Sequence, residues 1–351
     1  MVEKNHLTWI DLLNITACIG VLLLHCTNGQ VHNFSGVPSV NWFIGLTTHS
    51  LYLWPVDVFF MISGFTLLRK FSLIDNNNSG GVKTFYLKRL RRIAIPVFSW
   101  NCVYMFLYFA GTYIDGHNLL PLSMLVKKFF LFDFNGFMWF FVPLIMIYLS
   151  LPFFAVFVLN SSRMLLRLYL IIGLMLSFIP PLDPKFSVTE GFSDIYLMGS
   201  RYLYFIVAGY YIGHFDISKR MRNYIYSFSL LSAVIIFIGT IILSLYWNTH
   251  TMYFLTYSNI PCTLTAIGVF TFFKYYDWNK LLKKLHLNNS LIAKYSAFSL
   301  GIYLVQGFWF TFIGHFHICN NHIILKFVLM YSVCVLSVFA IKHIPVLKKT
   351  I

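Results

Sequence analysis

Residues 9–31 read WIDLLNITACIGVLLLHCTNGQV, and this stretch decides the class of fold. No acidic or basic residue other than histidine follows Asp11 in it. The segment is therefore long and apolar enough to cross the ~30 Å hydrocarbon core of a bilayer as a helix. His25 lies well inside the segment. Because an ionisable side chain is costly to bury in a membrane, His25 marks a candidate functional site.

Two polar positions precede His25 on the same predicted helix face. Cys18 and Asn14 lie seven and eleven positions earlier. Eleven residues at 100° each return to within about 20° of the starting direction. The sequence therefore predicts one inward stripe of Asn14, Cys18 and His25, which we interpret as the catalytic wall of a membrane enzyme.

The rest of the chain continues the apolar pattern of the first segment. Of its 351 residues, 58% are hydrophobic and only 11% are charged, whereas about 25% of a soluble domain is charged. We expect an all-α integral membrane protein, with a single domain over residues 1–351 and a bundle of about ten transmembrane helices. The predicted spans are residues 10–31, 46–68, 93–114, 137–158, 164–180, 202–215, 224–247, 254–275, 295–315 and 323–341.

The net charge of +15 indicates membrane topology rather than nucleic-acid binding. If the N-terminus is cytoplasmic and the spans alternate, most lysines and arginines fall on the inner side, as the positive-inside rule requires. Those that fall outside are Lys127, Lys128, Lys185, Arg201 and Lys326. We therefore predict that both termini are cytoplasmic. We also predict that the protein's partner is the lipid bilayer.

The cysteines and histidines do not predict a metal site. The six cysteines have no CxxC spacing and lie in or beside apolar runs, so we expect neither a zinc site nor a disulfide framework from them. His315, His317, Cys319 and His322 resemble zinc ligands in type. However, positions i and i+2 do not face each other on a helix, so we predict that they cap helix ends.

Asp57 is a second ionisable residue inside an apolar run. It lies in residues 56–65, VDVFFMISGF. One interpretation is a polar contact that joins two helices. The other is a carboxylate that orients His25 or holds its proton. We expect Ser63 and Gly64 in the same run to permit close helix packing, since a nucleophilic serine would need a strand-to-helix elbow.

A basic cluster follows, in residues 85–96, FYLKRLRRIAIP. Positive-inside anchoring explains such clusters in general. Arg89 and Arg92 are three residues apart and therefore neighbours on a helix face, where two guanidiniums could clamp a phosphate. If the third span begins here, its N-terminus adds a partial positive charge. The cluster predicts a phosphate-bearing cofactor that arrives from the cytoplasm.

These motifs, taken in order, resemble those of acyltransferase family 3. The series begins with IDLL at residues 10–13, which leads to His25, and continues with residues 56–65 and with the basic cluster before Pro96. It goes on through MWF at 138–140 with Tyr148 and Pro152, FIVAGYY at 205–211 and SLGIYLV at 299–305. The resemblance covers nearly the whole chain.

The resemblance implies a membrane O-acetyltransferase. Members of this family have about ten helices and move an acyl group, usually acetyl from acetyl-CoA, onto a hydroxyl of a carbohydrate outside the cytoplasm. It implies that His25 is essential and that Arg89 and Arg92, with Lys88 beside them, contact CoA. The family usually has an arginine where this chain has Asn14, and often a histidine where this chain has Gln306.

We expect His25 to act as general base on the acceptor hydroxyl, in direct transfer or through an acetyl-histidine. Asn14, Gln306 or Tyr303 would donate to the carbonyl oxygen. The expected location is the plasma membrane of a bacterium. One alternative is a transporter or exporter of a glycan or small molecule that uses His25 and Asp57 as a proton relay. Another is an accessory membrane subunit with a decayed site.

Overall fold

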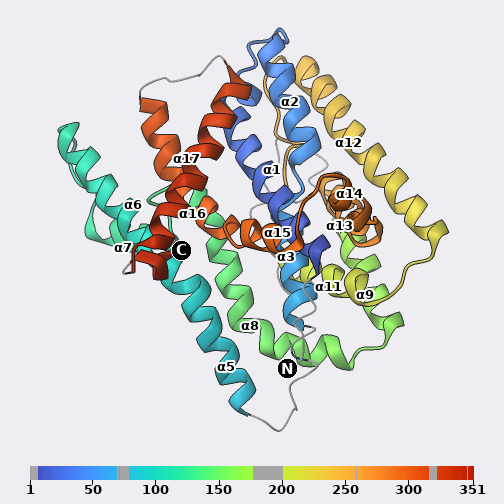
Figure 1. Ribbon diagram of the computed structural model, residues 1–351. Helices are drawn as coiled ribbons and strands as arrows, with labels where there is room; N and C mark the ends of the chain where they lie inside the picture. Colours follow the sequence, from blue (N-terminus) through green and yellow to red (C-terminus); the bar gives the residue numbers. More distant parts are fainter. Residues whose placement is uncertain are drawn as a thin grey trace. The chain divides into compact units, whose positions relative to one another are not determined.

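A computed structural model describes residues 7–68, 71, 79–176, 201–257, 259–315, 322–345 and 347–351. Within these residues all regular structure is helical (Figure 1). Six helical stretches are long and apolar enough to cross a membrane: Thr8–His32, Val40–Leu68, Gly81–Ile114, Gly136–Asn160, Lys219–Trp247 and Ile323–His343. The predicted all-α class is confirmed. The number of ten spans and the cytoplasmic placement of both termini stay predictions.

The other four predicted spans also fall on helices, but on shorter or bent ones. They are α9 (Arg163–Leu176), α11 (Arg201–His214), α13 (Ile260–Tyr275) and the pair α15 (Asn289–Ser296) and α16 (Ser299–His315). The last pair is bent by 45° at its break, and it makes a seventh span if it is counted as one. The end of the predicted span 164–180 lies outside the described residues, as do Lys185, His317 and Cys319.

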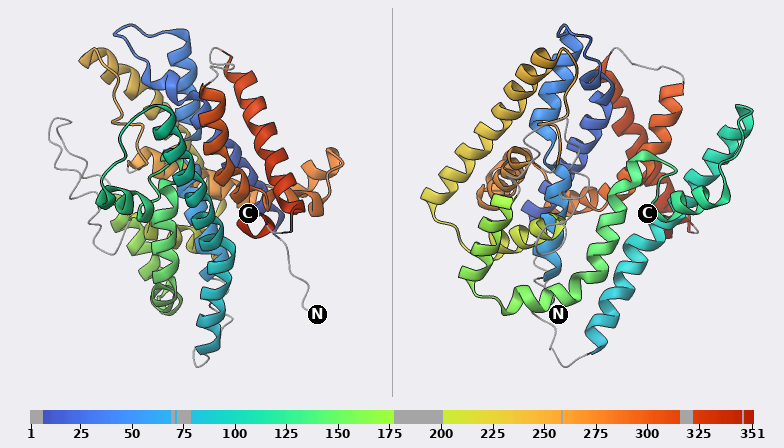
Figure 2. Two further views of the ribbon diagram at one scale, coloured as in Figure 1. Left: turned by 90° about the vertical axis from the view of Figure 1, so that its left-hand side faces the viewer. Right: turned by 180° about the vertical axis from the view of Figure 1, so that it is seen from behind.

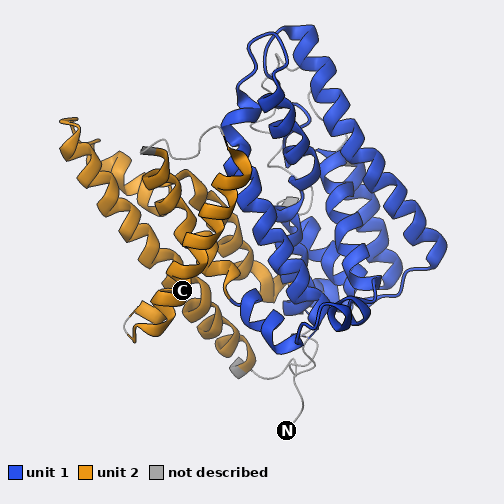
Figure 3. Cartoon of the chain, turned by 45° about the horizontal axis from the view of Figure 1, so that its top comes forward, with its two compact units in different colours: residues 1–73, 155–297 blue, residues 74–154, 298–351 orange. Residues whose placement is uncertain are grey.

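The chain forms two compact units, each assembled from two separate segments (Figure 3). The first unit contains residues 1–73 and 155–297. The second contains residues 74–154 and 298–351. His25, Asn14 and Asp57 therefore belong to the first unit, whereas the basic cluster, Tyr303 and Gln306 belong to the second.

In the first unit, α1 (Thr8–His32) packs antiparallel to α2 (Val40–Tyr52) and α3 (Pro55–Ser63). Two glycines fix the register. A Cβ on Gly20 would lie 2.8 Å from Pro55 Cγ, and a Cβ on Gly45 would lie 2.7 Å from the backbone nitrogen of Val31. The helices therefore approach closely at both ends of the pair, and this approach sets which residues of α2 lie beside His25.

Helix α3 continues into a π-helical turn, η1 (Gly64–Leu68), and both pack against α11. The contact depends on two glycines. A side chain on Gly64 would overlap the backbone of Ile206, and one on Gly209 would overlap the backbone of Met61. The prediction that Gly64 permits close packing is confirmed. The two sequence motifs at 56–65 and 205–211 thus form one helix interface.

The longest helix of the first unit, α12 (Lys219–Trp247), packs along α13 and is drawn in yellow in Figure 2. Ser218 caps its N-terminus, since the serine Oγ accepts from the backbone N–H of Met221. At the end of α13, Lys274 Nζ donates to the carbonyls of Ile212 and Phe215, 2.9 Å from each. The short helix α14 (Trp278–Lys284) then leads to α15.

The second unit is organised around one long helical stretch, Gly81–Ile114. It consists of α5 (Ser79–Arg89), a π-helical turn η2 (Leu90–Ala94) and α6 (Ile95–Ile114). Also in this unit are α7 (Leu122–Phe130), η3 (Gly136–Phe140), most of α8 (Phe141–Asn160), α16, α17 (Ile323–His343) and η4 (Leu347–Thr350). Helix α16 packs against α6 and α17, and Trp100 Nε1 donates to the Thr350 carbonyl at 3.1 Å.

The structure corrects one expectation about the basic cluster. Arg89 and Arg92 do not lie at a helix N-terminus, because the helix that carries them begins at Ser79, ten residues before Arg89. The partial positive charge of a helix end is confined to the first turn, so it does not add to their charge. A π-helical turn crosses the cluster instead, and such turns are frequent at functional sites.

Candidate functional site

His25 lies partly buried on α1, beside a second histidine that comes from α2. His49 is only 6% exposed and forms a side-chain hydrogen bond with the backbone of Leu24, the residue before His25. His25, His32 and His250 all act electrostatically on His49. The first unit therefore holds a group of four histidines around the C-terminal half of α1.

The group extends to the end of α1. The rings of His32 and His250 lie 4.8 Å apart, centre to centre, in an edge-to-face arrangement. His250 Nε2 is 3.1 Å from the sulfur of Met252. Burial, and next the neighbouring His32, lower the pKa of His250 below its ordinary value, so the neutral ring is favoured there.

Asn14 has a different environment from the one expected. Its side-chain nitrogen donates to both the carbonyl and the Oγ of Ser296, at 3.0 Å each. Eleven residues of helix separate Asn14 from His25 by about 16 Å along the axis. A donor to the reacting carbonyl would have to lie within about 3 Å of it, and the expected role of Asn14 at that carbonyl stays a prediction. In the structure, Asn14 holds the end of α15 against α1.

Asp57 is fully buried in the first turn of α3 and accepts a hydrogen bond from the Sγ of Cys262, at 3.3 Å. The contact joins α3 to α13, as the first interpretation of Asp57 required. A carboxylate in the first turn of a helix also interacts favourably with the helix dipole. Since Pro55 packs on Gly20 and the helices are antiparallel, Asp57 lies nearer the level of Cys18 than that of His25.

Tyr303 and Gln306 lie buried on α16, three residues apart and therefore on neighbouring positions of one face. The ring of Tyr303 packs on Phe140 and Phe141, at 5.6 and 5.3 Å between centres. The hydroxyl of Tyr104 donates to the Leu304 carbonyl at 2.6 Å and accepts from the Phe308 N–H at 3.1 Å. The Tyr104 hydroxyl thus connects two backbone groups of α16 in the turn that carries Gln306.

Arg89 is the half-buried member of the basic cluster, whereas Lys88, Arg91 and Arg92 are exposed. Its guanidinium lies over the rings of Phe85 and Tyr148, 5.8 Å from each centre, and it is hydrogen-bonded to the Tyr148 side chain. Its Nε is buried without a hydrogen-bond partner. A buried guanidinium N–H without an acceptor fits an incoming anion, and Arg92 is close enough to act on Arg89 electrostatically.

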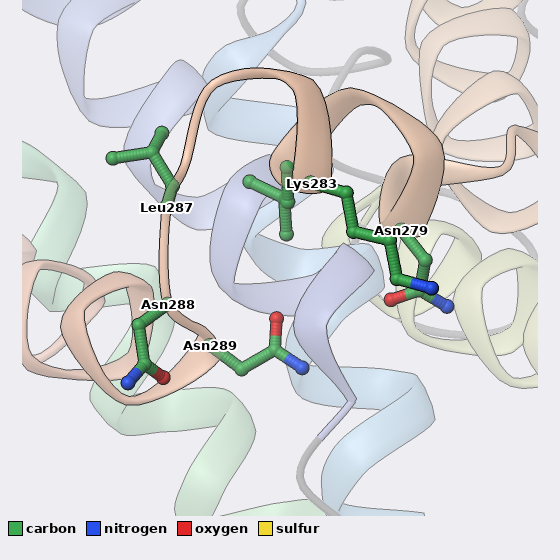
Figure 4. A pocket seen from close by; sticks show the side chains of 6 residues that line it. Asn279, Lys283, Leu287, Asn288 and Asn289 are labelled. Atoms are coloured by element: carbon green, nitrogen blue, oxygen red, sulfur yellow. The ribbon is translucent and has the colours of Figure 1, made fainter.

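A pocket of about 200 Å³ lies elsewhere in the first unit, between α14 and the start of α15 (Figure 4). It is lined by Asn279, Leu282, Lys283, Leu287, Asn288 and Asn289. None of the residues predicted to carry chemistry lies in this lining. Across the part of the chain that the structure describes, no group of three or more His, Cys, Asp or Glu residues is arranged to hold a metal ion.

Sequence reasoning missed His49, Tyr104 and Cys262. His49 lies within the predicted second span, so the rule that singled out His25 applied to it equally. Tyr148 appears among the motifs that carried the family resemblance, but nothing in the sequence linked it to Arg89, 59 residues earlier. Only the packing of α8 beside α5 makes that link.

A family model described as an acyltransferase domain matches residues 7–343. The chain belongs to acyltransferase family 3. The match includes every residue that we predicted to carry chemistry, and membership in acyltransferase family 3 identifies the protein as a multi-pass membrane acyltransferase. No curated protein and no solved structure matches the chain.

Proposed function

We propose that this member of acyltransferase family 3 is an O-acetyltransferase of the plasma membrane of a bacterium. It transfers acetyl from acetyl-CoA on the cytoplasmic side to a hydroxyl of an extracytoplasmic or cell-surface glycan. The observation that carries the proposal is the family match over residues 7–343, which supplies the reaction class. The half-buried imidazole of His25, inside a membrane-spanning helix, supplies the acid–base group.

His25 acts as general base in this proposal. It takes the proton of the acceptor hydroxyl while that oxygen attacks the thioester carbonyl, and the C–S bond then breaks. A well-placed imidazole contributes about 10²–10⁴-fold to such a rate. Tyr303 and Gln306 act as neutral donors to the carbonyl oxygen, on which negative charge develops during the attack.

Arg89, Arg92 and Lys88 bind the phosphates of acetyl-CoA. The support is the partnerless Nε of Arg89 together with its cation–π contacts with Phe85 and Tyr148. These contacts restrict the guanidinium, so less side-chain freedom is lost when an anion binds. Arg92 and Lys88 are exposed and supply charge at the same place in the chain.

The central test replaces His25 with alanine in cells that carry the protein. We expect the acetyl mass to disappear from the surface glycan while the variant remains folded in the membrane. His117→Ala is the matched control, because His117 is an exposed histidine outside the four-histidine group. Substantial glycan acetylation by His25→Ala would refute the role of His25. Substrate flux without consumption of acetyl-CoA would indicate a transporter instead.

The donor site is tested by calorimetry with acetyl-CoA and the detergent-purified protein. Hydrogen bonds to charged groups contribute about 1.5–3 kcal/mol each, so we expect Arg89→Ala with Arg92→Ala to weaken binding about tenfold or more. Arg91→Ala removes an exposed arginine of the same cluster and serves as the control. Equal affinities of the double variant and the wild type would remove Arg89 and Arg92 from the donor site.

A further inference from the structure

We propose that His49 is a proton-relay residue, and that His25, His49, His32 and His250 carry the acceptor's proton toward the end of α1 at His32. This inference rests on the proposed function. It adds a route for the proton and assigns roles to three histidines other than the expected base.

The first step depends on the register of α1 and α2. Gly20 packs on Pro55 and Gly45 packs on Val31, so the antiparallel register stays about the same along the pair. His49 follows this register, because it is hydrogen-bonded to the backbone of Leu24. Its imidazole therefore lies at the level of His25 on α1.

The second step concerns the two ring nitrogens of His49. One of them makes the hydrogen bond with the Leu24 backbone, and Nε2 is buried without any partner. If the bonded nitrogen donates to the carbonyl, the neutral ring presents Nε2 as a bare acceptor. Nε2 is therefore the atom of His49 that can take up a proton from His25.

The third step continues the path to the exposed end of α1. His32 is exposed, and its ring touches that of His250 at 4.8 Å between centres. His250 Nδ1 is buried and has no hydrogen-bond partner, as is Nε2 of His49. The groups that act electrostatically on His49 are His32, His25 and His250. A proton on His49 thus lies within electrostatic reach of these imidazoles, which can accept it in turn.

The chemistry balances without a further reactant. The hydroxyl O–H bond breaks and its proton moves to His25 as the new C–O bond forms. The C–S bond breaks and its electron pair leaves on the CoA sulfur. The proton on His25 passes to His49 Nε2 and, by way of His250, to the exposed His32, which releases it to solvent, while the thiolate takes a proton from the cytoplasmic solvent. His25 is then neutral again and ready for another acceptor.

The experiment uses the purified protein in liposomes with acetyl-CoA and the surface glycan that carries the acetyl mass in cells with the wild-type protein. His49→Asn is the informative variant, since the asparagine nitrogen can replace the bond to Leu24 while Nε2 is lost. General acid–base groups are worth about 10²–10⁴-fold, so we expect His49→Asn to lower kcat about tenfold or more. We also expect a changed pH profile and an unchanged KM for acetyl-CoA. His32→Ala tests the exposed step, and imidazole added on the side of His32 should restore its rate.

The controls separate this inference from the proposed function. His117→Asn should leave the rate and its pH profile unchanged. Wild-type protein without acetyl transfer would contradict the proposed function itself. An active wild type with His49→Asn and His32→Ala variants of equal rate and equal pH profile would overturn the relay alone. If His49→Asn does not fold, the failure of imidazole to restore His32→Ala would still overturn it.

Discussion

Asn14 joins two helices through a single amide group. Both of its hydrogen bonds reach Ser296, the last residue of α15, where the chain turns toward α16. Carbonyl groups at a helix end lack partners within the helix, and a side-chain donor there satisfies them. Asn14 therefore acts on helix packing, a role that its position in a polar stripe did not reveal.

The variant Asn14→Leu tests this role by removing both donors while keeping a side chain of similar size. Each hydrogen bond contributes about 0.5–1.5 kcal/mol net, so we expect the free energy of unfolding in detergent to fall by about 1–3 kcal/mol. Asn28→Leu, at an exposed position of the same helix, should change it by less than half of that. If the two variants unfold alike, the contact with Ser296 does not stabilise the protein.

At the scale of the element, α3 and η1 approach α11 closely in the first unit. Gly64 and Gly209 face each other's helix, and each leaves room only for a hydrogen. Small residues at such a crossing allow backbone atoms to touch, and van der Waals packing of this kind drives the association of helices in membranes. This interface holds α3, the helix that carries Asp57, against α11.

We expect Gly64→Ala and Gly209→Ala each to destabilise the protein by about 1–3 kcal/mol or more, because the added methyl meets backbone that has no rotamer to change. Gly111→Ala in α6 is the control, since a Cβ there would meet nothing within 4 Å. Alanine also favours a helix over glycine, so this control should unfold at the same temperature as the wild type or higher. Unfolding temperatures in detergent decide the matter.

Apolar length predicted the helices well, because hydrophobic runs report directly on the medium around them. Within the described residues each of the ten predicted runs overlaps a helix, and Pro55 and Pro261 lie in the first turn of their helices, where proline is favoured. Register and partner choice were beyond the sequence. Asp57 meets Cys262 and Arg89 meets Tyr148 across separations of 205 and 59 residues, which helix periodicity does not encode.

At the scale of the whole molecule, histidine titration couples folding to pH. The pKa of His250 is lowered in the folded protein by burial and by His32. The unfolded chain therefore binds a proton at about the ordinary pKa of 6.5, at which the folded protein still resists protonation. The contribution of His250 to stability is therefore fully present above pH 6.5 and is lost as the pH falls below it.

We therefore expect the unfolding temperature in detergent to drop between pH 7.5 and pH 5.5, and His250→Gln to make the drop smaller. Glutamine keeps a polar side chain but does not titrate. His117→Gln, at an exposed histidine outside the group, should reproduce the wild-type curve. An unchanged slope in His250→Gln would show that His250 does not contribute to acid sensitivity.

The candidate site could be predicted only in part, because the choice of partner residues depends on how the helices pack. The burial of His25 followed from its position in an apolar segment, and Arg89 followed from charge density. His49 approaches His25 only because α1 and α2 pack in one register, and Asn14 serves Ser296 only because α15 ends where it does. Such neighbours are set by three-dimensional packing, which single residues do not reveal.

The hydroxyl of Tyr104 connects two backbone groups of α16, since it donates to the Leu304 carbonyl and accepts from the Phe308 N–H. Positions where a side chain enters the backbone hydrogen bonding of a helix are places where helices bend. Tyr104 and Arg89 share the helical stretch Gly81–Ile114 and lie about 22 Å apart along it. One phenol therefore links the turn of α16 at Gln306 to the helix that carries Arg89.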